Sequence, residues 1–529
     1  MCGILFSISK DLASIDPQEW NTLQELNKLR GPDAQNLVQV QSNYLLQFYS
    51  TVLHLRGPSV VPQPLQDTDH NILCWNGEIF DGIQIASGQN DTQVLMDQLQ
   101  ATTTEQAILN VMQTIEGPYA FVYYRASTNK VYFSRDCLGR RSLLWHQSDH
   151  SLLLSSVGRS SDWKEVPANG IYSVDLTQSM TPQLIPWTYE PSPLMYPFPR
   201  LNTEMPSLDD VVDPNTVPYI DPSMQEAITT LTRILSHSVQ QRVADIPHLD
   251  VKGQQARVAI LFSGGLDCIC LAALAHRHLP PSESIDLLNV AFENPRAQKN
   301  KLHPMYDTPD RITGRAGLEE LRQIAPERTW HFVEINVPYT EAMAYRQRII
   351  DRMFPLDTVM DLSIAMAFWF ASRGKGVVDT MPYQSHARVL ISGLGADEQL
   401  GGYSRHREAF RHGQWERLIQ ETQLDVDRIS HRNLGRDDRI MSDHGKEVRF
   451  PFLSTAVVDW LCRQPIHLKM DLRYNRGIGE KLLLRHLARQ QLGLVNASQN
   501  WKRAIQFGAK TAKMTGETRS EKGQHKLQE

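Results

Sequence analysis

Hydrophobic and polar positions alternate over short distances in the first third of the chain. Short apolar runs are separated by Gly, Pro, Asn and Asp, which is typical of β-strands joined by turns. We expect strands at 2–8, 44–53, 72–75, 120–125, 131–134 and 151–155. Helical spacing interrupts them at 16–29 and 91–100. The mixture predicts an α+β domain of packed antiparallel sheets.

The pattern changes further along the chain, where continuous apolar runs alternate with longer helical stretches. Strands are expected at 258–262, 285–292, 330–337 and 389–391. Helices are expected at 266–278, 318–324, 340–353 and 359–373, and over most of 413–512. Fully apolar strands that alternate with helices predict an α/β domain with a parallel sheet covered on both faces. Ligands of such sheets bind at the carboxyl ends of the strands.

A proline-rich stretch separates the two patterns. Ten of the 29 prolines lie between Pro182 and Pro222, and proline is excluded from long helices and central strands. Aromatic residues within this connection indicate that it lies against a domain surface. We therefore expect a first domain at 2–180, a linker at 181–222, a second domain at 223–512 and a polar, disordered tail at 513–529.

Composition narrows the classes of function. The chain has 529 residues, of which 41% are hydrophobic and 21% charged, as expected for a soluble protein of two or three domains. A net charge of −5 gives no electrostatic reason to expect nucleic acid or an acidic membrane surface as partner. No apolar stretch approaches the length of a membrane helix. Six scattered cysteines do not resemble a disulfide framework, so a reducing, cytoplasmic location is expected.

The residue after the initiator methionine is a cysteine. Removal of Met1, which a small second residue permits, would leave Cys2 with a free α-amine beside its thiol. The reference pKa values, about 8 for the amine and about 8.5 for the thiol, allow the amine to act as general base for the thiol. We expect Cys2 to be a nucleophile; the alternative is that the Met-Cys start is incidental.

Residues that can support such a nucleophile follow in the first domain. Asn76 and Gly77 come after an apolar strand and can donate an amide N–H and a backbone N–H to an oxyanion. Arg56 can bind an α-carboxylate with two hydrogen bonds, or it forms a surface ion pair. Asp91 opens a helix, where it can bind an α-ammonium group or serve as the N-cap.

Six motifs occur in a fixed order before the linker. They are Met-Cys-Gly-Ile at 1–4, Arg-Gly-Pro-Asp at 30–33, Asn-Gly-Glu-Ile at 76–79, Asn-Asp-Thr at 90–92, Glu-Gly-Pro-Tyr-Ala-Phe at 116–121 and Arg-Asp-Cys-Leu-Gly-Arg-Arg at 135–141. Together they resemble the class II, N-terminal-nucleophile glutamine amidotransferase domain. The resemblance implies a four-layer sandwich of antiparallel sheets. It also implies Cys2 as nucleophile, Asn76 and Gly77 as oxyanion hole, and as glutamine ligands Arg56, Glu78 and Asp91.

A glycine-rich loop joins the first strand and first helix of the α/β pattern. Backbone N–H groups at a helix N-terminus bind anions, and the glycines of this loop let a phosphate approach. The chain has no GxxxxGK[ST] motif, so this is not a Walker loop. The SGGxD sequence from Ser263 to Asp267 resembles the loop of enzymes that split ATP between the α and β phosphates. The alternative is an ordinary strand–helix turn.

Further motifs extend the resemblance over the whole chain. Ser-Gly-Leu-Gly-Ala-Asp-Glu at 392–398 and Gly-Lys-Glu-Val-Arg-Phe-Pro-Phe-Leu at 445–453 resemble the second and third signatures of glutamine-hydrolysing asparagine synthetases, and Lys481 and Lys502 follow in the expected order. Stretches at 53–57, 309–317, 433–439 and 476–481 resemble one subfamily, that of asparagine synthetase domain-containing protein 1. We expect Arg436 and Arg439, within 433–439, to lie on a solvated helix face.

The resemblance implies ATP and Mg²⁺ at the second site. The residues implied for ATP or pyrophosphate are Ser263, Gly264, Gly265, Asp267, Ser392, Gly393 and Lys502, and those for the metal are Asp267 and Asp397. Ammonia from glutamine would pass to aspartate, activated as an acyl-adenylate, to give asparagine, AMP and pyrophosphate.

Three positions depart from the family pattern, all in the second domain. Cys268 replaces a serine, Leu394 a glutamate and Ser454 an aspartate. A carboxylate at position 394 can orient substrate or take a proton from ammonia, so its loss leaves open another carboxylic acid as acceptor. It also leaves open a weakly catalytic, nucleotide-binding scaffold. The sequence leaves a homodimer open as well.

Overall fold

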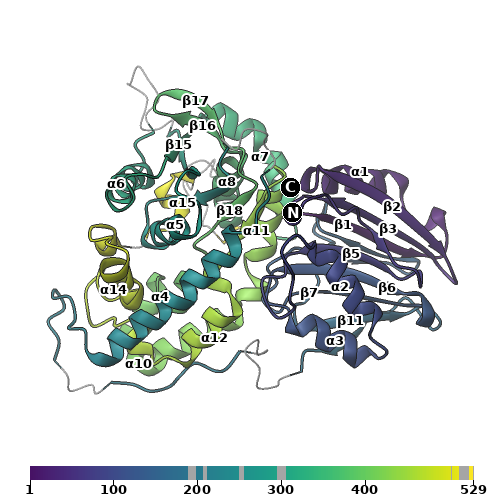
Figure 1. Cartoon of the computed structure of the whole chain (residues 1–529), viewed down its shortest axis with the longest axis horizontal. Helices are drawn as coiled ribbons and strands as arrows, with labels where there is room; N and C mark the ends of the chain where they lie inside the picture. Colours follow the sequence, from purple (N-terminus) through teal and green to yellow (C-terminus); the bar gives the residue numbers. More distant parts are fainter. Residues whose placement is uncertain are drawn as a thin grey trace.

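The computed structural model of this chain describes residues 1–188, 198–206, 211–248, 255–294, 306–501, 503–511 and 524–527. Two domains lie side by side, and the N-terminus is at their junction (Figure 1). No helix among the described residues is long and apolar enough to cross a membrane.

The first domain consists of two six-stranded antiparallel sheets packed face to face. Their strand orders are β10-β8-β9-β1-β3-β2 and β12-β11-β7-β6-β5-β4. The strands of the first sheet are β1 (Gly3–Ser9), β2 (Ala34–Gln41), β3 (Leu45–Val52), β8 (Leu144–Gln147), β9 (Ser151–Ser155) and β10 (Lys164–Glu165). Those of the second are β4 (Leu65–Gln66), β5 (Ile72–Gly77), β6 (Tyr119–Arg125), β7 (Lys130–Arg135), β11 (Gly170–Asp175) and β12 (Gln183–Pro186).

Alternation along the strands produces the layers of this domain. On β1, Ile4 and Phe6 face the core between the sheets, whereas Leu5 faces outward and packs under Trp20 of α1 (Pro17–Arg30), as the period of two in a strand requires. The helices α2 (Asp91–Gln100) and α3 (Glu105–Thr114) cover the outer face of the second sheet. The expected four-layer sandwich is confirmed.

The second domain is built on a seven-stranded sheet with the order β17-β16-β15-β14-β13-β18-β19. Its strands are β13 (Val258–Leu261), β14 (Ile285–Phe292), β15 (Trp330–Val337), β16 (Lys375–Val378), β17 (Met381–Gln384), β18 (Val389–Ile391) and β19 (Glu447–Arg449). The strands from β15 to β19 in this order are parallel. The β16–β17 hairpin adds an antiparallel edge that periodicity did not predict.

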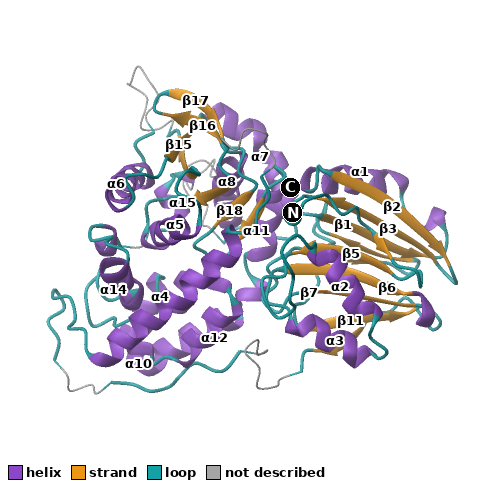
Figure 2. Ribbon diagram, viewed as in Figure 1, coloured by secondary structure: helices purple, strands orange, loops and turns teal. Residues whose placement is uncertain are grey.

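Helices cover both faces of this sheet (Figure 2). One face packs against α4 (Pro222–Val243), α5 (Leu266–His278) and α14 (Leu482–Gln491). The other packs against α7 (Tyr339–Met353), α8 (Val359–Arg373) and α11 (Leu434–Ser442). The remaining helices are α6 (Pro309–Ile324), α9 (Ala396–Leu400), α10 (Ser404–Asp427), α12 (Thr455–Arg463), α13 (Ile466–Lys469) and α15 (Ile505–Gly508). The expected α/β architecture is confirmed, with both faces buried.

The described parts of the connection between the domains contact both domains at some points, although Val211 and Tyr219 are almost fully exposed. Its first part still belongs to the first domain, because β12 pairs with β11 and Trp187 donates its indole N–H to the Ala168 carbonyl at 3.0 Å. Further along, Leu201 N donates to Gln423 Oε1 at 2.8 Å on the second domain. The sheet of the first domain therefore extends beyond residue 180.

Four residues of the expected tail are described, and they contact the second domain. The Val359 N–H donates to the His525 carbonyl at 3.0 Å, and the Leu527 N–H to the Asp357 carbonyl at 2.7 Å. Residues 524–527 are therefore held against the start of α8, unlike the disordered tail expected there. The rest of the expected tail lies outside the described residues.

Buried charges hold the two domains together. Arg30 of α1 pairs with Asp438 of α11 at 2.7 Å, and Arg242 of α4 pairs with Glu116 of the first domain at 3.0 Å.

The expectation that Arg436 and Arg439 lie on a solvated face is wrong. Each is 1% exposed. Arg439 pairs with Glu165 of the first domain, so the face of α11 that looked solvated in the sequence is an interface.

Candidate active sites

Most of the residues expected around Cys2 line one small pocket, and Asn76 is not among its lining residues. Cys2 precedes β1, Gly77 ends β5, and Asp91 opens α2. The pocket that holds them is lined by Cys2, Val52, Leu53, His54, Leu55, Arg56, Val61, Gln63, Trp75, Gly77, Glu78, Asn90, Asp91, Thr92 and Glu447. The thiol, two carboxylates and a guanidinium of the first domain thus share one cavity.

The thiol of Cys2 is not reactive without a base. Burial raises its pKa to about 11, so very little thiolate forms near pH 7. Burial also lowers the pKa of the Met1 amine to about 5. This Met1 amine donates to the Arg30 carbonyl at 3.5 Å, and it is not the α-amine that removal of Met1 would expose on Cys2.

Charged residues of the pocket pair with one another rather than with solvent. Glu78 contacts the Arg56 guanidinium at 3.3 Å and that of Arg449, from the second domain, at 3.3 Å. Burial raises the pKa of Glu78 to about 7 despite the Arg449 charge. The Arg56 side chain is 14% exposed, so its alternative as a surface ion pair is wrong.

Asp91 does not cap α2, although its position at the start of this helix allowed that role. The N-cap of α2 is Asn90, whose side-chain oxygen accepts from the Thr92 N–H at 3.0 Å. Asp91 instead accepts from the Ile79 N–H at 3.1 Å, and burial raises its pKa. Its carboxylate lines the pocket and remains available to a ligand amine.

Asn76 has the environment of an oxyanion-hole donor. It is fully buried, and neither polar atom of its amide has a hydrogen-bond partner among the described residues. A buried unpartnered amide is costly, and such exceptions are concentrated where a ligand supplies the partner. At Gly77, an added Cβ would lie 2.7 Å from Tyr119 Cβ and 2.8 Å from the Pro118 carbonyl oxygen, so only glycine fits.

Replacing Asn76 with alanine should lower the kcat of glutamine hydrolysis by about 10²–10³-fold, the usual cost of one oxyanion donor. Glutamate release under saturating glutamine measures this. The surface substitution Asn43→Ala, at an exposed position, is the control and should leave kcat unchanged. Equal rates for both variants would remove Asn76 from the site.

The second domain also contributes to this pocket, which sequence reasoning missed. Glu447 and Arg449 lie on β19, the edge strand of the parallel sheet. Burial opposes the charge of Glu447, but the Arg141 and Arg449 guanidiniums lower its pKa to about 2. Both residues lie in a motif that the sequence assigned to the ATP half, and no local signal placed them beside Cys2.

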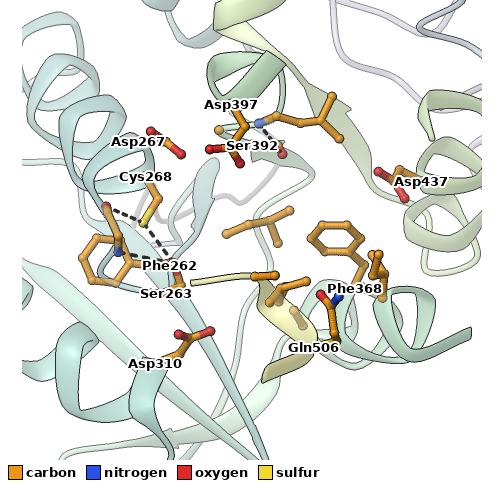
Figure 3. A pocket seen from close by; sticks show the side chains of 18 of the residues that line it. Phe262, Ser263, Asp267, Cys268, Asp310, Phe368, Ser392, Asp397, Asp437 and Gln506 are labelled. Atoms are coloured by element: carbon orange, nitrogen blue, oxygen red, sulfur yellow. Dashed lines mark hydrogen bonds between the residues drawn. The ribbon is translucent and has the colours of Figure 1, made fainter. Parts of the chain in front are cut away.

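The second candidate site lies where β13 and β18 end side by side. These neighbouring strands lead into the Ser263–Gly265 and Ser392–Gly393 loops. Because β14 lies on one side of β13 and β18 on the other, this is the point at which the strand order reverses, the usual ligand site of such sheets. Ser263, Gly265, Asp267, Ser392, Gly393 and Asp397 line a cavity of 220 Å³ there (Figure 3).

The first of these loops is shaped to receive an anion. Gly265 is the N-cap of α5 and makes no side-chain cap, so no side chain of the N-cap occupies the first N–H groups of this helix, which are the kind of donor that binds anions. Gly264 has φ +75°, and an added Cβ would lie 2.4 Å from the Thr313 carbonyl oxygen. This approach is to the backbone of α6, so packing alone requires a glycine at position 264.

The carboxylates of Asp267 and Asp397 both pair with one cationic side chain, that of Lys481. Lys481, to which the sequence assigned no role, places its Nζ 2.6 Å from Asp267 Oδ2 and 2.6 Å from Asp397 Oδ1. No group of three or more His, Cys, Asp or Glu side chains suited to a metal occurs in the described part of the chain. Two carboxylates suit Mg²⁺, which takes its other ligands from phosphate and water. Lys502 lies outside the described residues.

Substituting Asp267 with asparagine should reduce ATP–pyrophosphate exchange by about 10–100-fold or more, since even indirect metal contacts are worth that much. The measurement is incorporation of labelled pyrophosphate into ATP with a saturating carboxylic acid. Asp379→Asn, at an exposed turn, makes the same chemical change away from the site and should match wild type. Full exchange in Asp267→Asn would exclude this carboxylate from the nucleotide site.

The three departures from the family pattern lie in different surroundings. Cys268 donates its thiol to the Gly265 carbonyl at 3.2 Å within the phosphate loop. Leu394 lines the cavity and presents an alkyl group to it. Ser454 is buried at the N-terminus of α12. Of the three, Leu394 therefore changes the cavity wall most directly.

Comparison with known proteins finds a matching family model for each half of the chain. A glutamine amidotransferase domain model matches residues 1–169, and an asparagine synthase model matches 250–420 and 410–521. Asparagine synthetase domain-containing protein 1 of Homo sapiens is 39% identical, over 97% of this chain and 95% of its own length. The chain belongs to the asparagine synthetase family, in the group of asparagine synthetase domain-containing proteins.

More distant members of the family share most of the chain as well. An asparagine synthetase domain-containing protein of Saccharomyces cerevisiae is 35% identical over 92% of this chain and 87% of its own length. A putative glutamine-hydrolysing asparagine synthetase of Methanocaldococcus jannaschii is 25% identical over 79% of this chain and 69% of its own length. The two domains support an asparagine-synthetase-like, glutamine-dependent function.

Proposed function

We propose that this protein is a glutamine-dependent amidotransferase that uses ATP to convert a carboxylic acid into its amide. The observation that carries the proposal is the placement of β19. Arg449 contacts Glu78 in the Cys2 pocket, and its carbonyl accepts the Ser392 N–H of the nucleotide loop at 3.0 Å. One residue thus takes part in both candidate sites.

At the first site, the α-amine of processed Cys2 takes the thiol proton, and the sulfur attacks the glutamine amide carbon. Asn76 and the Gly77 N–H donate to the oxyanion that forms. The C–N bond breaks, ammonia leaves with the proton, and water then hydrolyses the glutamyl thioester. Arg56 binds the α-carboxylate of glutamine, while Asp91 and Glu78 bind its α-ammonium group.

At the second site, a carboxylate oxygen of the acceptor attacks the α-phosphorus of ATP, and pyrophosphate leaves. The N-terminus of α5 and the Ser263 and Ser392 hydroxyls hold the phosphates. Asp267 and Asp397 would hold Mg²⁺, which would supply positive charge beside the phosphates. Lys481, released from its two carboxylates, is free to contact the leaving pyrophosphate. Ammonia from the first site, passing through the interior, then attacks the acyl carbon, and AMP leaves.

Aspartate is the first acceptor to test, and asparagine the corresponding product. A second candidate function is a nucleotide-binding scaffold with weak catalysis, which the alkyl side chain of Leu394 in the cavity favours. ATP–pyrophosphate exchange over a panel of carboxylic acids separates these. Exchange with at least one acid supports the enzyme; measurable ATP binding without exchange for any acid supports the scaffold.

A further inference from the structure

A second cavity of the α/β domain adjoins the phosphate end of the candidate nucleotide site. It has a volume of 340 Å³ and lies between the start of α10, the segment that leads into α14, and residues 501–507. Its lining residues are Gly401, Gly402, Tyr403, Ser404, Arg407, Leu472, Arg476, Glu480, Trp501, Arg503, Ala504 and Phe507. No step of the proposed reaction uses this cavity.

Arg503 connects this cavity to the phosphate loop. It lines the 340 Å³ cavity, the 220 Å³ cavity and a third cavity of 110 Å³. The third cavity contains Ser263 and Gly265 of the phosphate loop together with Lys481, and Trp501 lines both it and the 340 Å³ cavity. A phosphate group that leaves the loop therefore has an adjoining cavity to enter.

Positive charge is in excess in the 340 Å³ cavity. Among the described residues, Arg407, Arg476, Arg503 and one carboxylate, that of Glu480, line it. Glu480 is already engaged, because its Oε2 accepts from Arg407 at 3.0 Å and its Oε1 pairs with Arg485 at 3.2 Å. Neither Arg476 nor Arg503 forms an ion pair with a described residue. Two guanidinium charges are thus left for an anion to neutralise.

The indole of Trp501 holds both of these guanidiniums at the cavity. The Cζ atoms of Arg476 and Arg503 lie 5.8 Å and 5.6 Å from the centroid of its ring, distances at which an aromatic ring attracts a cation. Such a contact orders a guanidinium without neutralising it, and its N–H groups stay able to donate to phosphate oxygens in pairs. The cavity therefore has the donors and the charge for a phosphate-bearing anion.

Pyrophosphate matches these donors better than a nucleotide does. All of its surface is phosphate, whereas a nucleotide also brings a base, and the Trp501 indole on which a base could stack is already contacted by two guanidiniums. Pyrophosphate is also released beside this cavity in the proposed reaction. The acceptor carboxylate displaces it from the α-phosphorus of ATP, and the bridging oxygen leaves with it.

We propose that the 340 Å³ cavity is a second anion site, which binds pyrophosphate through Arg476 and Arg503 after it leaves the phosphate loop. This inference rests on the proposed acyl-adenylating function of the second domain. Binding there would separate pyrophosphate from the acyl-adenylate before ammonia attacks, and so would oppose the reverse reaction that re-forms ATP.

The test uses full-length protein whose nucleotide site is saturated with α,β-methylene-ATP, which cannot be split between the α and β phosphates, in excess Mg²⁺. Pyrophosphate is then titrated by calorimetry. We expect wild type to bind it at one site per chain. Arg476→Gln should bind it at least tenfold more weakly, about the effect of one charged hydrogen bond, while its affinity for the ATP analogue stays that of wild type.

Arg322→Gln is the matched control. It removes the same charge from an exposed pair with Glu319 on α6, so its affinities for pyrophosphate and for the ATP analogue should both match those of wild type. A structural role of Arg476 would instead weaken the binding of both ligands in Arg476→Gln.

The other outcomes separate this inference from the proposed function. Displacement of the analogue by pyrophosphate without further binding, or an unchanged pyrophosphate affinity in Arg476→Gln, contradicts the second anion site. Equal weakening of both ligands contradicts it as well, and so does binding of AMP in place of pyrophosphate to the saturated protein. Failure of wild type to bind the ATP analogue would contradict the proposed function, and the inference with it.

Discussion

Cys2→Ala should abolish glutamine hydrolysis, with a fall in kcat of about 10⁴-fold or more, as expected when a covalent nucleophile is removed. The pocket around Cys2 holds carboxylates, a guanidinium and amide donors, none of which forms a thioester. Glutamate release is the measurement. The same variant should still form amide from added ammonium salts, because the second site is separate. Undiminished glutamate release in Cys2→Ala would contradict the assignment.

The α-amine of Cys2 is tested independently by the state of the N-terminus. Protein that retains Met1, or that carries an N-terminal tag, should be as inactive as Cys2→Ala, because the burial that raises the thiol pKa to about 11 leaves the sulfur without a base. Mass spectrometry verifies removal of Met1. Cys462→Ala, which changes a buried cysteine of the second domain, is the control and should retain glutaminase activity. Full activity with Met1 in place would require a different base.

Glu116→Gln should lower the free energy of unfolding by about 3–5 kcal/mol, the usual cost of breaking a buried ion pair. Glu116 accepts from Arg242 at 3.0 Å and from the Thr455 hydroxyl at 2.6 Å, and it lies 3.5 Å from Arg140. Desolvation already lowers the pKa of Arg242 to about 10, so its charge would be left poorly compensated. Urea unfolding followed by fluorescence measures the change.

The effect of Glu116→Gln should depend on pH. Burial opposes ionisation of Glu116, but the Arg140 and Arg242 charges outweigh it and hold the pKa of the carboxyl below its usual range. The stabilisation is therefore complete above the pKa of this carboxyl in the unfolded chain, and it is lost as pH falls through the folded-state pKa. The exposed pair of Glu319 and Arg322 supplies the control, Glu319→Gln, which should change stability by about 0–1 kcal/mol. A similar small change in Glu116→Gln would mean that the interface charges contribute little.

The local pattern of hydrophobic and polar residues was sufficient to predict most of the helices and strands. Apolar runs located β14 and β15 at their observed bounds, and helical spacing did the same for α5 and α8. It was insufficient where tertiary contacts decide the conformation, as in the β16–β17 hairpin at the sheet edge. The amphipathic helix α4 was also missed, and its apolar side packs on α5 and α14.

The residues around Cys2 could be predicted because each of them belongs to a short sequence motif. Asn76, Gly77, Glu78 and Asp91 each belong to a recognisable stretch in the first domain. The fold brings Gly77, Glu78 and Asp91 to one pocket with Cys2, and Asn76 lies next to Gly77 on β5. The Asn90 side chain, rather than Asp91, caps α2, which no spacing rule distinguished, because both residue types are good caps.

The sequence by itself determined the two-domain architecture and the glycine loops and predicted Cys2 as the candidate nucleophile, since periodicity and short motifs specify these. Tertiary structure alone decided that β19 joins the two sites, that Lys481 lies between Asp267 and Asp397, and that Arg436 and Asp437 are buried. A charged residue on a helix looks the same in sequence whether it faces water or another domain. Burial and the pairing of charges depend on which elements meet, and only the packing of α8, α11 and the first domain buries Arg436 and Asp437.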